Sequence, residues 1–513
     1  MDANAPDRFP APGQRRSWAR FVLAAVIVVV LTAGATATAG LLNVQSFVDD
    51  LRAGGTISGA EAVISRADAG EPQTLLLIGS DHRYGTGAGD ARSDTMMLVR
   101  IDPDAPATTV LSIPRDLMVS FSWRGAAYGP VKLNETYTVG GEALTARVIS
   151  RLLGIRINHI ANVEFRGFRE AIDTIGCVYV DVDHRYWHRN GPGTDQYAEI
   201  DVNPGYQLMC GERALDYVRY RHLDNDLVRG ARQQDFLRQV RSQYSADRFL
   251  DDPHQLTSVI GRRMHTDADL QSVSSLLKLL RLVAFSARRP IQQVALEPTD
   301  YRAPDGIQYL QTTAADLRRV RAELLDPDDA PAPPAARAAR RRGGRRGGRR
   351  GRPASAPTAA SLGLADMAET GKQYAISLGP VTFPVYYPRL LPAGATYAPD
   401  NRGAEGGYPI VYRTKTPAGM KAAYRLVIPY GGPGNYVGVQ GLRWSDPPIL
   451  RNPSSDHRTV NGKKLDLWYD GTKLRLVAWR TPQAVYWISN TLQKRLSNDQ
   501  MLWMAGSLTR LGR

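Results

Sequence analysis

The segment from residue 326 to about residue 371 most limits how this chain can fold. It consists mainly of Pro, Ala, Gly, Arg and Ser, and it contains almost no large apolar side chain. Such a segment cannot bury a hydrophobic core, and the nine arginines between Arg337 and Arg352 repel one another. We therefore predict a disordered linker over residues 326–371, with one globular unit before it (74–325) and one after it (372–513).

The linker arginines also account for most of the positive charge. The 513 residues include 65 Lys and Arg against 50 Asp and Glu, a net charge of +15. Without these nine arginines, 56 basic residues face 50 acidic ones, a balance of +6 that excludes a uniformly basic nucleic-acid-binding protein. The linker is either a solvated spacer or a patch that holds an anionic polymer or lipid headgroups. The hydrophobic fraction of 43% excludes global disorder.

An uncharged stretch near the N-terminus predicts the compartment. No charged residue lies between Arg20 and Asp49, and the 22 residues 21–42 are almost wholly apolar or small. As a helix they would span about 33 Å, enough to cross a bilayer core. Arginines precede the stretch, so we expect residues 1–20 in the cytoplasm, a single transmembrane anchor, and the rest outside. The alternative is a signal peptide cleaved near Ala35-Thr36-Ala37, which also places the main body outside.

The predicted location outside the cytoplasm bears on the state of the two cysteines. Cys177 and Cys210 form an even pair, which can make a disulfide in an oxidising space. The alternative is two isolated buried thiols. Two cysteines are too few for a disulfide-rich scaffold or for a zinc site with four thiolate ligands.

The first globular unit alternates between strand and helix patterns. Residues 43–73, which contain several glycines, are expected to form a linker leading into it. Short apolar runs ending at turn residues predict strands over 74–79, 95–101, 109–113 and 178–183. Apolar residues at helical spacing predict helices over 142–153, 165–175, 211–218, 231–244 and 270–284. This alternation predicts an α/β fold, with a sheet covered by helices on both faces.

The second globular unit has mainly strand patterns. Strands are predicted over 410–414, 423–429, 464–469, 474–479 and 484–489, with turns such as Asp470-Gly471 between them. A final amphipathic helix is expected over 499–511. We predict a small α+β domain of unknown role, with no charged cluster of its own.

Four charged clusters in the first unit are the candidates for chemistry. Three of them lie at the ends of predicted strands, where an α/β sheet places ligand-binding residues. The four clusters are Gly79-Ser80-Asp81-His82-Arg83, Arg92-Ser93-Asp94-Thr95, Pro114-Arg115-Asp116, and Arg219-Tyr220-Arg221-His222 followed by Asp224, Asp226, Arg229, Arg232, Gln233 and Gln234.

These residue types suit a phosphate ligand. Arginine binds phosphate oxygens through two parallel hydrogen bonds and keeps its charge. Asp81 and Asp94 could hold a divalent cation, Mg²⁺ or Mn²⁺, which prefers one or two carboxylates together with substrate phosphates. Arg219 and Arg221 point the same way only if their segment is extended. The alternative is a structural network of arginines and carboxylates that ties the strand ends together.

Five motifs in a fixed order make the match specific. They are Leu76-Leu77-Ile78-Gly79-Ser80-Asp81, Arg92-Ser93-Asp94-Thr95-Met96-Met97, Ser112-Ile113-Pro114-Arg115-Asp116, Lys132-Leu133-Asn134, and Ala214-Leu215-Asp216-Tyr217-Val218-Arg219-Tyr220-Arg221 with Arg229 and Arg232-Gln233-Gln234. With these motifs the sequence resembles the LytR-CpsA-Psr (LCP) family of bacterial cell-wall glycopolymer ligases. The resemblance covers about residues 74–245 and continues more weakly to about residue 300.

The resemblance implies a phosphotransferase with a three-layer α/β/α sandwich whose interior holds a lipid tail. Such enzymes move a glycopolymer from a polyprenyl-pyrophosphate carrier to peptidoglycan through a phosphodiester bond. By matching position, Asp81 and Asp94 correspond to the carboxylates that bind the metal and activate the hydroxyl, and Arg115 is a further catalytic residue. The residues that match the pyrophosphate clamp or its supports are Arg92, Arg115, Arg219, Arg221, Arg229, Arg232 and Gln233.

The resemblance also implies the partners and the location. The donor would be a polyprenyl-pyrophosphate-linked glycan and the acceptor peptidoglycan, handled by a membrane-anchored enzyme outside the cytoplasm that binds no nucleic acid. The cysteine pair and Arg219-Tyr220-Arg221-His222 are most similar to actinobacterial members, which join arabinogalactan to peptidoglycan. Two other functions fit the same residues: hydrolysis of polyprenyl pyrophosphate, and non-enzymatic regulatory binding of polyprenyl phosphates.

Overall fold

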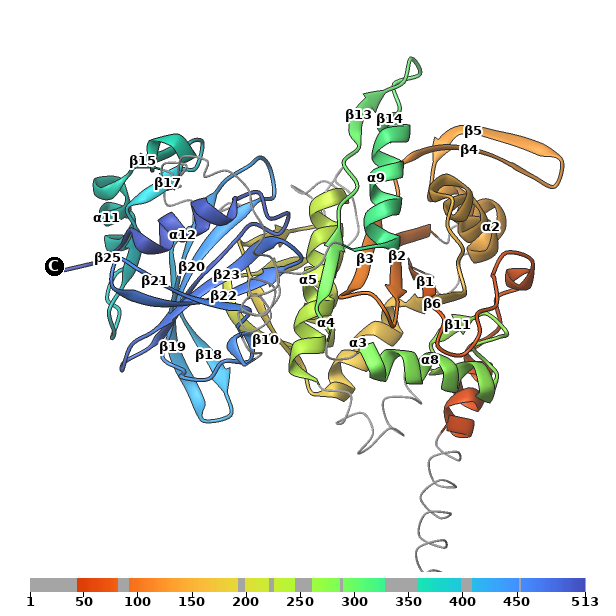
Figure 1. Cartoon of the computed structure of the whole chain (residues 1–513), viewed down its shortest axis with the longest axis horizontal. Coiled ribbons are helices and arrows are strands. Elements are labelled where there is room, and N and C mark those ends of the chain that lie inside the picture. The colour runs from red at the N-terminus through yellow and green to blue at the C-terminus, as the bar shows by residue number, and fades with distance from the viewer. Residues whose placement is uncertain are drawn as a thin grey trace, which may run out of the picture.

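The computed structural model describes residues 44–81, 92–191, 199–220, 226–244, 261–286, 289–327, 358–397, 408–451 and 454–512. They form two folded units that lie side by side, an N-terminal domain (44–327) and a C-terminal domain (358–512) (Figure 1). The predicted anchor at 21–42 and the linker arginines lie outside the described residues. Among the described residues, no helix is both long enough and apolar enough to cross a membrane.

A mixed six-stranded sheet forms the centre of the N-terminal domain. β1 pairs antiparallel with β2 and parallel with β6. The strand order is β11–β6–β1–β2–β3–β12, with β1 (Gln73–Asp81), β2 (Arg92–Ile101), β3 (Thr108–Ile113), β6 (His159–Glu164), β11 (Met264–Thr266) and β12 (Ile291–Val294). The three apolar runs predicted as the first strands are therefore neighbours in one sheet.

Helices cover both faces of this sheet (Figure 1). Leu76, Leu98 and Leu111 point to one face and are fully buried against α2 and α9. The alternate residues of the same strands face α3, α5 and α8, because successive side chains of a strand point to opposite sides. These helices are α2 (Glu135–Leu153), α9 (Ala314–Leu325), α3 (Phe165–Ile175), α5 (Asp226–Gln243) and α8 (Val273–Ser286). The N-terminal domain is thus an α/β domain with a helical layer on each side.

Smaller elements complete the N-terminal domain. Two hairpins that were not predicted project from it, β4–β5 and β13–β14. A two-stranded sheet, β7–β10, lies between the main body and the C-terminal domain and leads into α4. The bounds are β4 (Met118–Trp123), β5 (Ala126–Lys132), β7 (Val178–Val182), β8 (Tyr186–His188), β9 (Ile200–Val202), β10 (Gly205–Met209), α4 (Gly211–Arg219), β13 (Thr299–Arg302) and β14 (Gln308–Gln311).

The C-terminal domain is mostly β, so the predicted α+β class is wrong for it. Its main sheet has seven antiparallel strands in the order β18–β19–β20–β24–β23–β22–β21. The predicted final helix over 499–511 ends at residue 506, and β25 follows it. The bounds are β18 (Ile410–Thr416), β19 (Gly419–Pro429), β20 (Tyr436–Leu442), β21 (Asp456–Val460), β22 (Lys463–Asp470), β23 (Lys473–Arg480), β24 (Val485–Ser489), α11 (Ala368–Ile376), α12 (Asn498–Gly506), β16 (Tyr386–Pro388) and β25 (Leu508–Arg510).

Both predicted linkers extend too far into folded chain. Residues 44–54 form a helix, and Ile57 and Ala60 are buried in the core under α2. β15 (Leu364–Asp366) and the start of α11 fall within the linker predicted over 326–371. Each stretch contributes only a few apolar residues to a core built mainly by other segments, so its local pattern did not show that it is packed.

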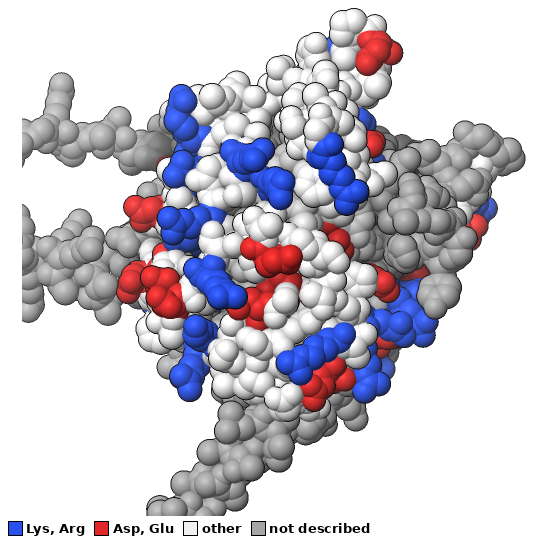
Figure 2. Space-filling model, turned by 90° about the vertical axis from the view of Figure 1, so that its right-hand side faces the viewer, with Lys and Arg blue, Asp and Glu red and all other residues white. Residues whose placement is uncertain are grey.

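The charges on the surface are mixed in sign. Figure 2 shows the N-terminal domain from its outer side, where Lys and Arg side chains alternate with Asp and Glu side chains. No single basic surface covers this view, in agreement with the small charge balance outside the linker arginines.

Candidate active site

The ends of several strands bring the predicted clusters to one edge of the central sheet. β1 ends at Asp81, whose partner in the register is Arg92 at the start of β2. Ile113, the last residue of β3, lies opposite Met96, so the turn that carries Arg115 follows directly at the same edge. The first three clusters are therefore adjacent in space, because antiparallel pairing places the end of one strand beside the start of the next.

A β-bulge marks this edge. Gly79 pairs with Thr95, but Ser80 pairs with Ser93, which leaves Asp94 without an opposite residue. A bulge bends the strand and changes the direction of its side chains, and bulges are frequent next to active sites. The side chains of Asp81, Arg92 and Asp94, and the whole of Arg221, lie outside the described residues.

Arg115 lies in a turn that several contacts hold in place. Its Nε is 3.7 Å from Asp116 Oδ2, and Lys132 Nζ is 2.8 Å from Asp116 Oδ1. The backbone N–H of Asn134 donates to the Arg115 carbonyl over 3.1 Å. Asp116 and Asn134 thus connect the turn after β3 with the Lys132-Leu133-Asn134 motif, and the Arg115 side chain is mostly buried at the sheet edge.

Gln233 on α5 joins the fourth cluster to the same edge. Its Nε2 donates to Thr95 Oγ1 over 2.9 Å and to the Val218 carbonyl over 3.1 Å. Thr95 follows Asp94, and Val218 precedes Arg219. One amide group therefore holds the start of β2 and the end of α4 together.

Helix α5 can approach the sheet closely because residue 230 is glycine. A Cβ atom at Gly230 would lie 2.5 Å from Ser112 Oγ and 2.8 Å from Ser112 Cβ on β3. The neighbouring Arg229 is buried, with 4% of its surface exposed. Gly230 was not singled out from the sequence, since nothing in the local pattern shows that this side of the helix faces a strand.

Arg232 supports the segment that follows α4. Its Nη1 donates to the carbonyls of Tyr217 (2.9 Å) and Tyr220 (2.8 Å), and its guanidinium lies 4.4 Å from the centre of the Tyr186 ring. The side chain is completely buried. Arg232 is therefore a positioning residue: it fixes the end of α4, where Arg219 is the last helical residue and Tyr220 is extended.

Arg219 makes ion pairs with acids of its own helix. Its Nη2 lies 2.7 Å from Asp216 Oδ1 and 3.9 Å from Glu212 Oε1. Burial raises the pKa of the Asp216 carboxyl above its usual range, although Arg219 acts in the opposite direction. This contact is of the kind expected for a structural arginine–carboxylate network.

A polar network beneath the end of β1 was not predicted. Ser80 Oγ donates to Asn162 Oδ1 (2.9 Å), and Asn162 Nδ2 donates to Tyr137 Oη and Glu142 Oε1 (2.8 Å each). His265 Nδ1 lies 3.7 Å from Glu142 Oε1. Burial, with the Glu142 charge, raises the pKa of Tyr137 to about 12. The hydrogen bond to Glu142 raises the pKa of His265, and hydrogen bonds from His265 and Asn162 lower the pKa of Glu142 against the effect of burial.

One local signal could have pointed to this network. Tyr137 lies three residues after Asn134 of the Lys-x-Asn motif, and Gly140-Gly141 interrupts α2 just before Glu142. The backbone of both glycines is not helical, so the helix changes course where Glu142 enters the network. His265 could not be identified in this way, because it comes from β11, far along the chain.

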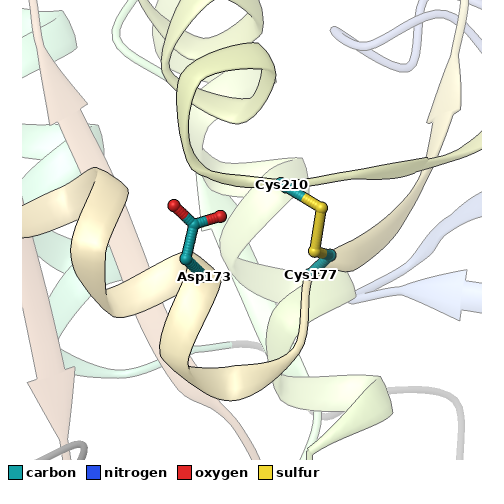
Figure 3. Close-up of side chains that lie close together, drawn as sticks. All are labelled: Asp173, Cys177 and Cys210. Atoms are coloured by element: carbon teal, nitrogen blue, oxygen red, sulfur yellow. A yellow bond between two sulfur atoms is a disulfide. The ribbon is translucent and has the colours of Figure 1, made fainter.

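A disulfide joins Cys177 and Cys210 at the starts of β7 and α4 (Figure 3). Asp173 lies beside it, and its Oδ1 accepts a hydrogen bond from the Gly211 N–H over 2.7 Å. These three side chains are close enough to suggest a metal site, but both sulfurs are bonded to each other. Asp173 instead caps the N-terminus of α4, where a negative charge is favourable.

The fold and the site define a class of protein. The family model described as the LytR_cpsA_psr family matches residues 49–326, more than half of the chain. The chain therefore belongs to the LytR_cpsA_psr family.

Individual relatives are known in several bacteria. The chain is 26% identical over 305 residues to the polyisoprenyl-teichoic acid–peptidoglycan teichoic acid transferase TagU of Halalkalibacterium halodurans, covering 59% of this chain and 94% of TagU. It is 31% identical over 204 residues to the probable cell wall biosynthesis protein LcpB of Corynebacterium glutamicum, covering 37% of this chain and 46% of LcpB. The crystal structure of Bacillus subtilis TagV aligns with a TM-score of 0.41 and 26% identity, over 50% of this chain and 96% of TagV.

Proposed function

We propose that this protein is an extracytoplasmic phosphotransferase that moves a glycopolymer from a polyprenyl-pyrophosphate carrier to peptidoglycan. The chain is an enzyme of the LCP type, a glycopolymer–peptidoglycan transferase. Its relatives TagU and TagT are named polyisoprenyl-teichoic acid–peptidoglycan teichoic acid transferases. The observation that carries the proposal is the meeting of the Asp81, Asp94 and Arg115 clusters at one sheet edge.

In the proposed reaction, an acceptor sugar hydroxyl attacks the phosphorus next to the glycan. A new phosphorus–oxygen bond forms to the acceptor, the bond to the second phosphate breaks, and polyprenyl phosphate leaves. One of the carboxylates Asp81 and Asp94 accepts the proton of the hydroxyl. The charge on the phosphate oxygens is balanced by arginines, whose forks bind phosphate bidentately. We assign this role to Arg92, Arg115, Arg219 and Arg221, with Arg229, Arg232 and Gln233 holding their segments in place.

The two carboxylates also fit a divalent cation. Asp81 and Asp94 supply hard oxygen donors from neighbouring strand ends, the donor type that Mg²⁺ and Mn²⁺ prefer. When bound, the ion neutralises charge on the phosphoryl group being transferred.

We further infer an actinobacterial type of donor, arabinogalactan, and a membrane-anchored protein whose N-terminus is cytoplasmic. The Cys177–Cys210 disulfide supports a location outside the cytoplasm, because such bonds persist in oxidising compartments. LcpB, a relative from Corynebacterium glutamicum, supports a role in wall biosynthesis in that group of bacteria. Comparing purified lipid-linked arabinogalactan and teichoic acid as donors tests this choice: faster transfer of teichoic acid contradicts it.

Substitution at the sheet edge tests the reaction. We expect Asp94→Ala and Arg115→Ala to reduce transfer from a lipid-pyrophosphate donor by at least about 10²-fold, because each removes charge that the reacting phosphate needs. Asp300→Ala and Arg302→Ala, on the exposed strand β13, are the matched controls and should transfer normally. Unchanged transfer in both site variants contradicts the proposal. Release of polyprenyl phosphate that does not depend on the acceptor glycan identifies a hydrolase instead.

A further inference from the structure

Helix α8 exposes three large apolar side chains. Leu280, Val283 and Phe285 are 40%, 41% and 64% exposed. Among the described residues, eight large hydrophobic side chains are exposed, and three of them lie on this one helix. Leu280 and Val283, three residues apart, lie on one side of the helix in line with Val273 and Leu276, and Phe285 lies on another side. Single exposed apolar residues are normal on a soluble protein, but three on one helix indicate an interaction surface.

One side of α8 is packed against the domain, and the charges of the helix have one sign. Leu279 and Leu282 are buried under the sheet. The helix contains no acid, and its charged residues are Lys278 and Arg281. Arg289, just beyond the helix, places its guanidinium 5.3 Å from the centre of the Phe285 ring. An apolar face bordered by cations is typical of helices that lie in the interface of an anionic membrane.

The start of the described chain lies directly against α8. Val44 and Phe47 pack against Val273 and the buried Leu276. The uncharged segment 21–42 ends two residues before Val44, a distance of at most about 7 Å along the chain. Figure 1 shows the 44–54 helix, in red, beside α8 at one end of the domain, whereas the β13–β14 hairpin projects from the opposite end. With residues 21–42 as the proposed anchor, the bilayer is placed next to α8.

We propose that α8 lies in the outer headgroup layer of the membrane and docks the N-terminal domain on an anionic phospholipid surface. This inference rests on the proposed function, because the lipid-linked donor and the anchor are what bring the enzyme to a bilayer. A lipid surface fits better than a protein partner for two reasons. The apolar face continues from Val44 and Phe47, which follow the anchor segment in the sequence, and its cationic border complements anionic headgroups.

An environment-sensitive fluorophore tests the docking on the full chain in vesicles of phosphatidylcholine and phosphatidylglycerol. Leu280→Cys or Phe285→Cys gives a single reactive thiol, because Cys177 and Cys210 are bonded to each other. At both positions we expect a blue-shifted emission that nitroxide-bearing lipids quench about twofold, since interfacial helices bury their apolar face just below the headgroups. The control is Ile307→Cys, which is 45% exposed between β13 and β14 and should stay in water.

Two outcomes overturn the docking. Water-like emission at both α8 positions excludes membrane contact. A blue shift without lipid quenching means that protein covers the face, either a second copy or another segment of this chain.

Activity separates this inference from the proposed function. In the triple variant Leu280→Ser, Val283→Ser and Phe285→Ser, we expect kcat/KM for a long-chain donor in vesicles to fall about tenfold, because the enzyme loses its hold on the surface. Transfer from a short-chain, water-soluble donor should not change. An equal fall for both donors contradicts docking. If the wild type transfers neither donor, the proposed function fails while the quenching experiment still decides the docking.

Discussion

Two faces of the N-terminal domain differ in what covers them. The face formed by β7, β10 and α5 is covered by the C-terminal domain, and that contact contains buried ion pairs beside an apolar cluster around Tyr206 and Trp487. Asp181 of β7 and Arg425 of β19 form a buried ion pair of 2.5 Å, and the Trp487 indole N–H donates to the other Asp181 oxygen over 3.3 Å. The α8 face, by contrast, is apolar and exposed.

A second buried ion cluster also joins the C-terminal domain to the N-terminal domain. Asp470 at the end of β22 pairs with Arg238 of α5 at 2.5 Å and with Lys494. Burial lowers the pKa of Lys494 to about 8, and Arg238 and Lys494 together lower the pKa of Asp470 against the effect of burial. Each acid is therefore held by a specific partner from the other domain.

The difference shows that hydrophobicity alone does not reveal which surface is an internal contact. An apolar face makes non-directional contacts, which suits a fluid lipid surface. Buried ion pairs are satisfied in one geometry only, so the Asp181–Arg425 and Asp470–Arg238 contacts define one orientation for the C-terminal domain against α5. Helix α5 in turn carries Gln233 and Arg232. These two side chains hold the start of β2 and the end of α4 in place.

The largest expected effect comes from breaking the Asp181–Arg425 pair. Arg425→Met leaves Asp181 buried without its counter-ion, and we expect it to lower the free energy of unfolding by about 3–5 kcal/mol. Equilibrium urea unfolding of the detergent-solubilised chain, followed by tryptophan fluorescence, measures the change. The double variant Asp181→Asn, Arg425→Met should regain most of the loss, because no unpaired charge remains.

Two controls sharpen this comparison of the faces. Arg389→Met removes an arginine that also pairs with an aspartate, Asp366, but both side chains are about half exposed. Phe285→Ser changes the uncovered α8 face. Neither should alter the unfolding free energy measurably. Similar losses in all three single variants would mean that the two faces do not differ energetically.

A smaller effect is expected from the packing of α5 on β3. In Gly230→Ala the new methyl group would collide with Ser112, which should cost about 1–3 kcal/mol and also reduce transfer, because α5 moves away from Thr95. Thermal unfolding and a transfer assay measure both. Ser112→Gly in the same chain removes the collision and should restore activity. Failure of this rescue would indicate that Gly230 is needed for another reason.

The smallest effect concerns pH and the Glu142–His265 pair. Because folding raises the pKa of His265, the protonated ring stabilises the folded protein fully below pH 6.5, the ordinary histidine pKa. This stabilisation is lost as the pH rises through the pKa of His265 in the folded protein. Because folding lowers the pKa of Glu142, the carboxylate stabilises the folded protein fully above pH 4.5, the ordinary glutamate pKa. This stabilisation is lost as the pH falls through the pKa of Glu142 in the folded protein. The pair therefore contributes most between these limits. His265→Gln should remove about 0.5 kcal/mol in this window, since the half-exposed ring is screened by water. An unchanged pH profile of thermal stability contradicts this role.

Much of the N-terminal domain could be predicted from local periodicity. The helix predicted over 165–175 is α3, and the first three predicted strands lie within β1, β2 and β3. In the C-terminal domain, β20 was missed because Gly438 and Gly441 weaken its strand pattern. A Cβ atom at Gly438 would overlap the Arg425 guanidinium, so this glycine makes room for the buried ion pair. The contact with Arg425 on the neighbouring strand therefore requires glycine at position 438, and this glycine weakens the strand pattern in the sequence.

The candidate site was likewise predicted only in part from the sequence. The charged clusters were recognised because their residues are adjacent in sequence and follow one another in a fixed order. Their meeting at one edge depends on the strand register, which the sequence pattern does not specify. His265 and Gly230 belong to the site through contacts with Glu142 and Ser112, which are more than a hundred residues away. Such roles require the three-dimensional structure.

The position of α8 under the sheet also sets a length scale for the substrate. Leu75 packs into the cluster beneath α8, and Asp81 lies six residues further along the same strand, about 20 Å away. The phosphate-handling edge therefore lies most of one strand length, along the plane of the sheet, from the cluster that α8 covers. With α8 on the bilayer, a lipid-linked donor has to bridge this distance, and the length of its isoprenoid becomes a property that the enzyme can select.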